Sequence, residues 1–269
     1  MAQRATGRGA RGRTLSDPPG SFFHVIILIM LIDSHCHLHD REFFTADEAE
    51  KMLENAKNNG VEKIICIGTN HADSLAARDF ATAHENVFWT YGIHPESTAE
   101  TPKLEKDNKL VAIGEIGLDY HYETQNRPAQ IKLFETMLQI ADDDNLPVSF
   151  HIREAFDDFF GIIANFPKIR GVVHSFSDNK KNLNKILNTT DFYIGINGLA
   201  TYSTLPTPPL ERILLETDAP FLTPAPNRGK INEPAYIKDI AVWLSTKLGV
   251  SAQKISDVTT QNARNIFSI

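Results

Sequence analysis

The stretch L-I-D-S-H-C-H-L-H, residues 31–39, ends an apolar run that begins at Val25 and places two histidines one residue apart. A short apolar run bounded by polar residues is typical of a buried strand. Because side chains alternate between the faces of a strand, Asp33, His35 and His37 share one face. Two imidazoles at this spacing can hold one metal ion, since zinc binds nitrogen at about 2.0–2.1 Å. Ordinary surface histidines can show the same spacing, so a metal site is indicated only if other residues of the chain add further ligands.

The composition is that of a globular protein. Of the 269 residues, 42% are hydrophobic and 23% are charged, and the only cysteines are Cys36 and Cys66. So few cysteines argue against a disulfide framework and favour a reducing compartment, which we expect to be the cytoplasm. The formal net charge of −7 argues against a broad basic surface for duplex DNA. An anionic substrate would have to be attracted locally, by metal ions or by clustered arginines.

Within residues 1–29, residues 1–20 differ in composition from the rest of the chain. They carry several arginines and glycines and no acidic residue before Asp17. The apolar run that follows is shorter than the about 20 residues needed to span a membrane, and no small-residue cleavage site follows it. We expect a flexible extension, with Met30 as a possible functional start, or alternatively an organellar transit peptide. A single domain is expected over residues 30–269.

From Asp33 onward, short apolar runs alternate with helical patterns. After the first apolar run, strand-like segments occupy residues 61–68, 87–92, 110–114, 147–150, 171–173, 192–196 and 213–215. Helical patterns occupy residues 46–59, 72–84, 128–144, 154–165, 179–187, 234–248 and 251–267. Strands that alternate with helices form parallel βαβ units, and eight such units predict an α/β fold, the (β/α)8 TIM barrel. A doubly wound open sheet is the alternative.

Two of the eight outer helices have no counterpart in this pattern. Residues 94–110 form a polar stretch that contains Pro95 and Pro102, and residues 197–213 contain three prolines. Proline inside a helix removes a backbone donor and clashes with the preceding turn. We therefore expect the helices after the third and seventh strands to be shortened or replaced by loops.

Residues of the types that bind metals fall at the carboxyl ends of the predicted strands. They are His35, His37, His94, Glu115, His151, His174 and Asp218. In TIM barrels the active site is built at this face, from the ends of several strands. Five of the ten histidines and two carboxylates are therefore expected to converge on one site.

Each of these residues also has a structural interpretation. A buried carboxylate is costly unless it is paired or bound to a metal, which favours a ligand role for Glu115. His151 shares a strand face with Arg153, so it can bind a metal, bind a phosphate, or be a hydrogen-bonded core histidine. The same alternatives hold for His174. Asp218 can be a ligand or can cap a helix.

Four histidines together with Glu115 and Asp218 suffice for two divalent ions, with Glu115 as the bridging carboxylate. Such a pair activates water near neutral pH and stabilises the attacking and leaving oxygens of an in-line displacement. Asp218 can orient or deprotonate that water, so Asp218 and Glu115 are the predicted catalytic residues. His94 can contact substrate, support a ligand from behind, or be an ordinary structural histidine, and we include it among the candidate substrate contacts. The sequence contains no G-x-S-x-G elbow, P-loop or glycine-rich dinucleotide turn, which leaves serine nucleophiles and nucleotide-dependent redox unsupported.

Seven ordered motifs cover the chain from about Met30 to Phe267. They are D-S-H-C-H-L (33–38), Y-G-I-H-P (91–95), G-E-I-G-L-D-Y (114–120), P-V-x-x-H-x-R-E-A (147–155), H-S-F-S (174–177), L-L-E-T-D-A-P (214–220) and R-G-K-x-N-E-P (228–234). Together they resemble the TatD family of metal-dependent deoxyribonucleases, which belongs to the amidohydrolase-like barrels. The chain departs from the family pattern at Asp178, where a glycine is usual, and in its N-terminal extension.

The resemblance implies hydrolysis of DNA phosphodiester bonds with Mg²⁺, Mn²⁺ or Zn²⁺, often from the 3′ end. It implies that His94 contacts the site or the substrate phosphate. It also implies a set of six metal ligands: His35, His37, Glu115, His151, His174 and Asp218.

The sequence itself offers Arg153 and the loop 226–234, with Arg228 and Lys230, as phosphate contacts. Guanidinium forks match the geometry of phosphate, although a salt-bridge network within the loop is the alternative. Single-stranded DNA ends fit a narrow barrel mouth better than duplex DNA does. Three aromatic residues are candidates for stacking the bases: Tyr120, Tyr122 and Phe176.

The rival function is a barrel amidohydrolase or esterase that acts on a small lactone or cyclic amide. The same metals serve either reaction, because a metal pair does not by itself select phosphorus over carbon. A third possibility is a binding protein whose barrel has lost catalysis, which the two shortened helices would make conceivable.

Overall fold

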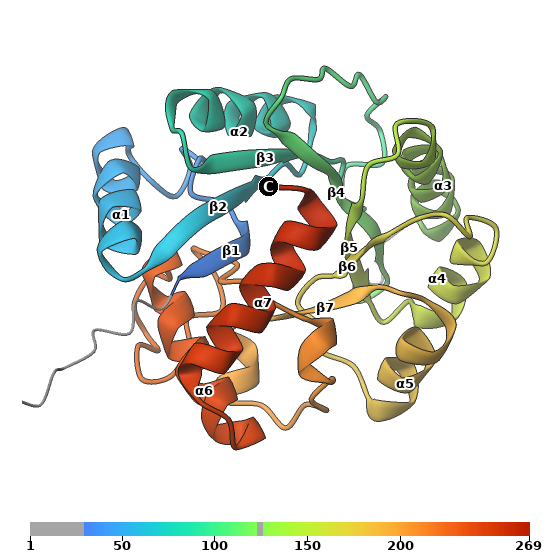
Figure 1. Ribbon diagram of the computed structural model, residues 1–269. Coiled ribbons are helices and arrows are strands. Elements are labelled where there is room, and N and C mark those ends of the chain that lie inside the picture. Colours follow the sequence, from blue (N-terminus) through green and yellow to red (C-terminus); the bar gives the residue numbers. More distant parts are fainter. Residues whose placement is uncertain (1–29, 123–125) are drawn as a thin grey trace, which may run out of the picture.

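The computed structural model describes residues 30–122 and 126–269, so the expected extension over residues 1–29 lies outside the described residues. Eight parallel strands follow one another around a ring in chain order. α-Helices surround this ring on the outside, as Figure 1 shows. The predicted (β/α)8 barrel is confirmed, and the alternative of a doubly wound sheet is wrong. No helix among the described residues is long and apolar enough to cross a bilayer.

The strands and helices lie close to their predicted positions. The strands are β1 (Leu31–Cys36), β2 (Val61–Ile67), β3 (Val87–Tyr91), β4 (Leu110–Asp119), β5 (Val148–Arg153), β6 (Gly171–Val173), β7 (Tyr193–Ile196) and β8 (Ile213–Leu215). The helices are α1 (Ala46–Asn58), α2 (His71–Ala83), α3 (Arg127–Asp143), α4 (Phe156–Ile163), α5 (Lys180–Thr189), α6 (Ile237–Leu248) and α7 (Ala252–Phe267). β4 and β5 are longer than predicted, so Glu115 and His151 lie within strands rather than after them.

The helices expected to be missing after β3 and β7 are indeed absent from the described chain. Turns and extended segments lead from β3 to β4, and the connection from β7 to β8 contains only two short 3-10 helices, Gly198–Thr201 and Leu210–Arg212. Loops therefore replace helices on two sides of the barrel.

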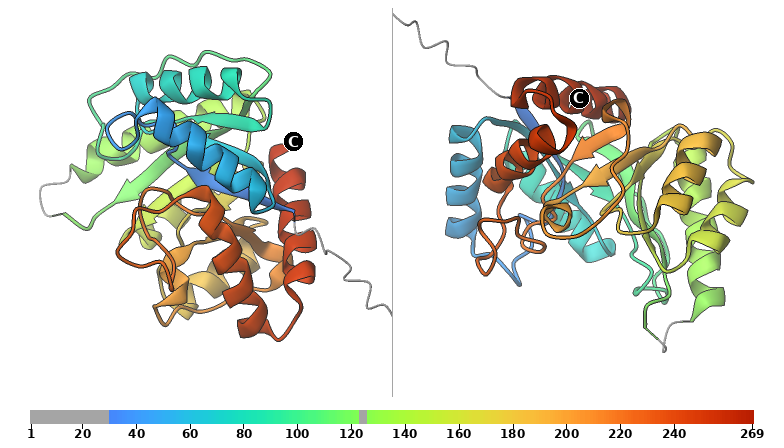
Figure 2. Two further views of the ribbon diagram at one scale, coloured as in Figure 1. Left: turned by 90° about the vertical axis from the view of Figure 1, so that its left-hand side faces the viewer. Right: turned by 90° about the horizontal axis from the view of Figure 1, so that it is seen from below.

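The amino-terminal end of the barrel is closed by α7, which lies across it (Figures 1 and 2). Ala263, Ile266 and Phe267 of α7 pack in one buried cluster with barrel side chains such as Val111 and Leu214. Burial of this much apolar surface is the main favourable contribution to folding. With this end filled, the opposite end is left for a site.

Packing on the outside of the barrel fixes the strand that carries His151. Phe150 contacts the rings of Phe134, Phe159 and Phe192, at centroid distances of 6.1, 5.3 and 4.9 Å. Aromatic pairs at such distances prefer defined geometries and add to the stabilisation from burial. Because side chains alternate along a strand, the outward anchoring of Phe150 turns the neighbouring His151 inward.

The ring closes between β1 and β8 through several hydrogen bonds, and a buried aspartate accepts two of them. No backbone ladder joins these two strands in the described part of the chain. The carboxylate of Asp33 instead accepts hydrogen bonds from the backbone N–H and the hydroxyl of Thr217, at 2.9 and 2.6 Å. The N–H of Asp218 donates to the carbonyl of His35 at 2.8 Å. These contacts together place His35, a predicted ligand of the first strand, beside Asp218, which follows the last strand.

Replacing Asp33 by alanine should lower the free energy of unfolding by about 2–4 kcal/mol, because two buried donors on Thr217 lose their acceptor. Urea denaturation followed by circular dichroism measures this loss. The exposed Asp191 provides the control, and Asp191→Ala should change stability by less than about 0.5 kcal/mol. Equal losses in the two variants would contradict the role of Asp33 in closing the barrel.

Candidate metal centre

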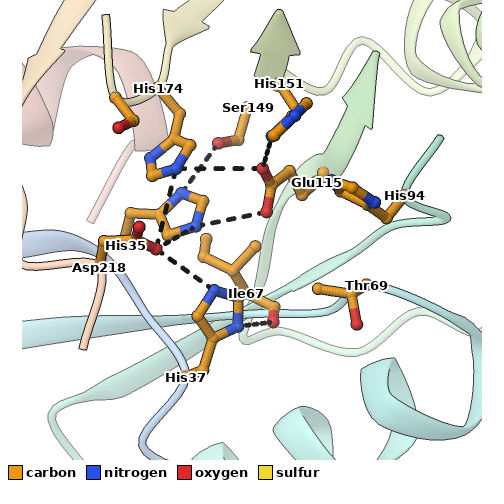
Figure 3. Close-up of polar contacts among 12 residues, drawn as sticks. His35, His37, Ile67, Thr69, His94, Glu115, Ser149, His151, His174 and Asp218 are labelled. Atoms are coloured by element: carbon orange, nitrogen blue, oxygen red, sulfur yellow. Dashed lines mark hydrogen bonds and ion pairs between the residues drawn. The ribbon is translucent and has the colours of Figure 1, made fainter. Parts of the chain in front are cut away.

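The predicted ligands meet at the carboxyl end of the barrel (Figure 3). Nε2 of His35 lies 3.5 Å from Oε2 of Glu115 and 3.6 Å from Oδ1 of Asp218. Nε2 of His37 lies 3.6 Å from the same oxygen of Asp218. Nε2 of His174 lies 3.9 Å from Oε1 of Glu115 and 3.8 Å from Oδ1 of Asp218. Side chains far apart in the sequence thus surround one small volume.

Glu115 lies at the middle of this cluster and also contacts its sixth member, because Oε1 is 2.7 Å from Nδ1 of His151. The pairing of β4 with β5 shifts register between Ile113 and Ile116. At this irregularity the N–H of Glu115 donates to the carbonyl of Gly68 at 2.8 Å rather than to the neighbouring strand. Such interruptions of a ladder re-aim side chains, and here the carboxylate points into the mouth of the barrel.

Buried carboxylates and imidazoles balance one another's charge in the cluster. Burial raises the pKa of Glu115, but the hydrogen bond with His151 and the nearby imidazole of His35 hold this pKa well below its usual range. Burial lowers the pKa of His174, but the charges of carboxylates including Glu216 raise it to about 10. Glu115 is therefore ionised, and positive charge on imidazoles such as that of His174 compensates it. Divalent cations can supply the same compensation in place of those protons.

An unsatisfied nitrogen tests whether these residues fit a metal. Nε2 of His35 is fully buried and has no hydrogen-bond partner among the described residues. It faces carboxylate oxygens of Glu115 and Asp218 at distances too long for hydrogen bonds, 3.5 and 3.6 Å. A cation shared by these groups would satisfy all three. A donor set of imidazole nitrogens and carboxylate oxygens suits cations such as Zn²⁺ or Mn²⁺.

Three overlapping groups have ligand atoms within 4.8 Å of one another: His35–His37–Glu115, His35–His174–Glu216 and His94–Glu115–His151. Glu115 belongs to two of them, which is the position expected of a bridging carboxylate. The structure thus brings all six predicted ligands together, and it adds Glu216 and His94 to the groups able to hold a cation.

Each of the four clustered histidines contacts a further group through its other ring nitrogen. The partners are Ser149 Oγ for His35 at 3.4 Å, the Ile67 carbonyl for His37 at 3.1 Å, Asp119 for His151 at 3.0 Å and Glu216 for His174 at 3.0 Å. Such partners fix the tautomer and orientation of metal-binding histidines. Asp119 and Glu216 are absent from the sequence-based prediction. The alternation of side chains along a strand could have identified both residues. Glu216 precedes Asp218 by two residues and Asp119 follows Glu115 by four, so each is expected on the same face as a predicted ligand.

His94, predicted to contact substrate, is a neutral ring at the side of the cluster. Its centroid lies 4.4 Å from that of His151, with the planes at 73°. Burial and the charge of His151 lower the pKa of His94 to about 4. Nδ1 accepts a hydrogen bond from the N–H of Glu96 at 3.3 Å, which assigns the ring proton to Nε2. His94 therefore has an N–H available for a ligand.

The two arginines predicted to bind phosphate have different surroundings. A cavity of about 720 Å³ opens over the cluster, and Arg153 lines it. Arg228 is not among the described residues that line this cavity, and its guanidinium lies 3.8 Å from the ring of Tyr202. The structure thus brings Arg153 to the site and leaves Arg228 in the neighbouring loop.

Two of the three aromatic residues predicted to stack bases are buried. Phe176 is 3% exposed and packs on Phe156 at 5.8 Å, while Tyr120 is 9% exposed and its hydroxyl donates to Asp158 at 2.7 Å. The stacking prediction is wrong for both, because helices and loops distant in the sequence cover their rings. Tyr122 is 48% exposed.

A (β/α)8 barrel with a histidine and carboxylate cluster at its carboxyl end defines the class of metal-dependent barrel hydrolases. Residues 32–268 match the family described as TatD related DNase. The Bacillus subtilis protein named uncharacterized metal-dependent hydrolase YabD is 31% identical over 257 residues, which cover 89% of this chain and 100% of the relative. The chain belongs to the TatD family, as its motifs indicated, and it is a metal-dependent hydrolase.

Two further comparisons concern a named exonuclease and a solved structure. The Pantoea ananatis protein named 3′-5′ ssDNA/RNA exonuclease TatD is 31% identical over 247 residues, which cover 83% of this chain and 95% of the relative. The crystal structure of YjjV, a TatD homologue from Escherichia coli, matches with a TM-score of 0.81 at 26% identity. This match covers 91% of this chain and 100% of that chain.

Adding Zn²⁺ or Mn²⁺ to chelator-treated protein should raise its thermal unfolding midpoint. A ligand at 100 times its Kd stabilises the native state by about 2.7 kcal/mol. Glu115→Gln removes the shared carboxylate and should abolish most of this gain, whereas Glu135→Gln on the exposed face of α3 should retain it. Calorimetry measures both midpoints, and equal gains in the two variants would contradict the proposed centre.

The variants Asp119→Asn and Glu216→Gln keep the side-chain shape but remove the charge beside His151 and His174. Each should weaken metal affinity by about 10–100-fold, because the imidazole loses its orienting acceptor. Competition with a chromophoric chelator measures this affinity, with Asp143→Asn on the surface as the control. Affinities within twofold of the control would show that these carboxylates do not act on the centre.

Proposed function

We propose that the protein hydrolyses phosphodiester bonds at single-stranded DNA ends, with cleavage from the 3′ end. The observation that carries this proposal is the shared position of Glu115, which contacts both halves of a cluster suited to two divalent cations, Mg²⁺, Mn²⁺ or Zn²⁺. The family description and the name of the Pantoea relative support a nucleic-acid substrate. The buried, unpaired cysteines Cys36 and Cys66 support a reducing compartment, and we propose the cytoplasm.

Divalent cations bound here would lower the pKa of a water and stabilise the charge on the phosphoryl oxygens. In this proposal Asp218 accepts the proton of that water. Burial raises the pKa of Asp218, but the charge of His174 and the nearby imidazole of His37 hold this pKa below its usual range. The carboxylate is therefore ionised and its Oδ1 faces the cluster, as a general base requires.

Two other side chains are proposed to position the phosphate. The neutral His94 can donate from Nε2 to a phosphate or leaving oxygen, while Arg153 can bind a second oxygen from its place in the cavity wall. Arg228 remains a predicted phosphate contact that would reach the substrate from the loop 226–234, outside the cavity.

The second candidate is hydrolysis of a small lactone or cyclic amide. The size of the cavity favours it, because about 720 Å³ lies within the roughly 300–1,000 Å³ typical of small-molecule sites. The amidohydrolase-like architecture of the barrel is compatible with either reaction.

An end-labelled single-stranded oligonucleotide distinguishes the two functions. The wild type should shorten it from the 3′ end with Mg²⁺ or Mn²⁺, and a chelator should stop the reaction. Asp218→Asn should lower kcat by roughly 10²–10⁴-fold, the contribution of a general base, while the exposed Asp191→Asn should be unchanged. Absence of cleavage with every metal, together with lactone or amide hydrolysis that Asp218→Asn abolishes, would favour the second candidate.

A further inference from the structure

Two phenylalanines form an exposed pair at the rim of the metal-centre cavity. Phe43 is 45% exposed and Phe221 is 46% exposed, and both line the cavity. Their ring centroids are 5.1 Å apart with the planes at 82°, an edge-to-face arrangement. We call Phe43 and Phe221 the aromatic pair. Because the ring planes are nearly perpendicular, the two rings together form an angled apolar surface that lines the cavity.

The aromatic pair adjoins the catalytic side of the cluster. The ring centroid of Phe221 lies 6.3 Å from that of His37, whose Nε2 is 3.6 Å from Asp218. The N–H of Phe221 donates to the carbonyl of Asp218 at 2.8 Å, which fixes the two residues relative to each other. A flat group resting on the pair would therefore lie beside the reacting bond without entering the cluster.

Neighbouring contacts hold both phenylalanines outward. Phe44 is buried at 2% exposure and anchors the turn, with its N–H donating to the carbonyl of Asp40 at 3.0 Å, so the adjacent Phe43 faces the cavity. The carbonyl of Phe221 accepts from the side-chain amide of the buried Asn232 at 2.6 Å. Core packing does not explain two half-exposed phenyl rings, and clustered exposed apolar surface at a cavity marks a binding site.

The cavity offers complementary contacts for the two parts of a nucleotide. Among the described residues that line it, Arg153 is the only lysine or arginine, so arginine and bound cations would attract a phosphate. The aromatic pair offers a flat apolar surface. Base stacking on aromatic rings tolerates any sequence, because every base has a π-face.

We propose that the aromatic pair is a base-binding subsite, in which one unpaired nucleobase beside the scissile phosphodiester stacks on Phe221 or Phe43. This inference rests on the proposed function, because it requires a nucleic-acid substrate. A base within a duplex is stacked on both faces by its neighbours and cannot present one to the pair. The subsite therefore also selects single-stranded ends.

The double variant Phe43→Ala with Phe221→Ala tests the subsite on end-labelled single-stranded DNA. Its KM should rise about tenfold, which corresponds to about 1.4 kcal/mol and is within the range measured for base–aromatic stacking. Its kcat should stay within about threefold of the wild type, because the pair does not touch the reacting atoms. Tyrosine at both positions should restore the KM, and Val242→Ala, exposed on α6, should leave it unchanged.

A modified substrate checks that the lost contact is with a base. An abasic nucleotide on one side of the scissile bond should raise the KM of the wild type about tenfold and leave the double variant unaffected. In the inactive Asp218→Asn background, 2-aminopurine at the same position should lose fluorescence on binding, and the added Phe43→Ala and Phe221→Ala changes should prevent this quenching. The second readout needs no turnover.

Two results overturn the inference, and they are distinguishable. If the wild type cleaves single-stranded DNA but the double variant shows the same KM or the same abasic penalty, the subsite is wrong and the proposed function stands. If the wild type cleaves no nucleic acid with any metal, the proposed function and the subsite fail together. Circular dichroism of the double variant, expected to match the wild type, verifies that its fold is intact.

Discussion

The structure depends on the contact between Asp33 and Thr217, which closes the barrel. These residues are 184 positions apart, and the N–H and the hydroxyl of Thr217 both contact one buried carboxyl group. Burial raises the pKa of Asp33 to about 8, although the hydrogen bonds from Thr217 oppose this shift. Since no ladder joins the first and last strands of the described chain, this contact acts together with the backbone hydrogen bonds from Asp218 to His35 and from His37 to Ala219, which hold His35 and His37 beside Asp218.

The chemistry of the site follows from that closure and from one irregular strand. Closure of the barrel brings the carboxylate of Asp218 beside His35 and His37. The register shift in β4 brings a second carboxylate, that of Glu115, to the same place. The second ring nitrogen of each clustered histidine contacts a hydroxyl, a carbonyl or a carboxylate, which orients the ring. A preorganised set of donors of this kind holds cations without rearrangement. The two loops that replace helices contribute residues such as His94 and Leu199 to the wall of the cavity over it.

Much of this arrangement could be predicted from the sequence because it depends on local pattern. Apolar runs identified all eight strands, the prolines in residues 197–213 identified a missing helix, and polar residues at strand ends identified the six clustered side chains. The lengths of β4 and β5 could not be predicted, because Glu115 and His151 interrupt the apolar pattern. The burial of Phe176 and Tyr120, and the exposure of the aromatic pair, depend on packing between segments distant in sequence.

The central claim is that six side chains, which lie in or just after β1, β4, β5, β6 and β8, hold divalent cations at one mouth of the barrel. Anomalous diffraction from crystals grown with Mn²⁺ tests it most directly. The predicted result is an anomalous peak bonded to Glu115, with a nitrogen of His35 or His151 as a further ligand at about 2.0–2.3 Å. A peak found only elsewhere, or none at a saturating Mn²⁺ concentration that still supports activity, would contradict the claim.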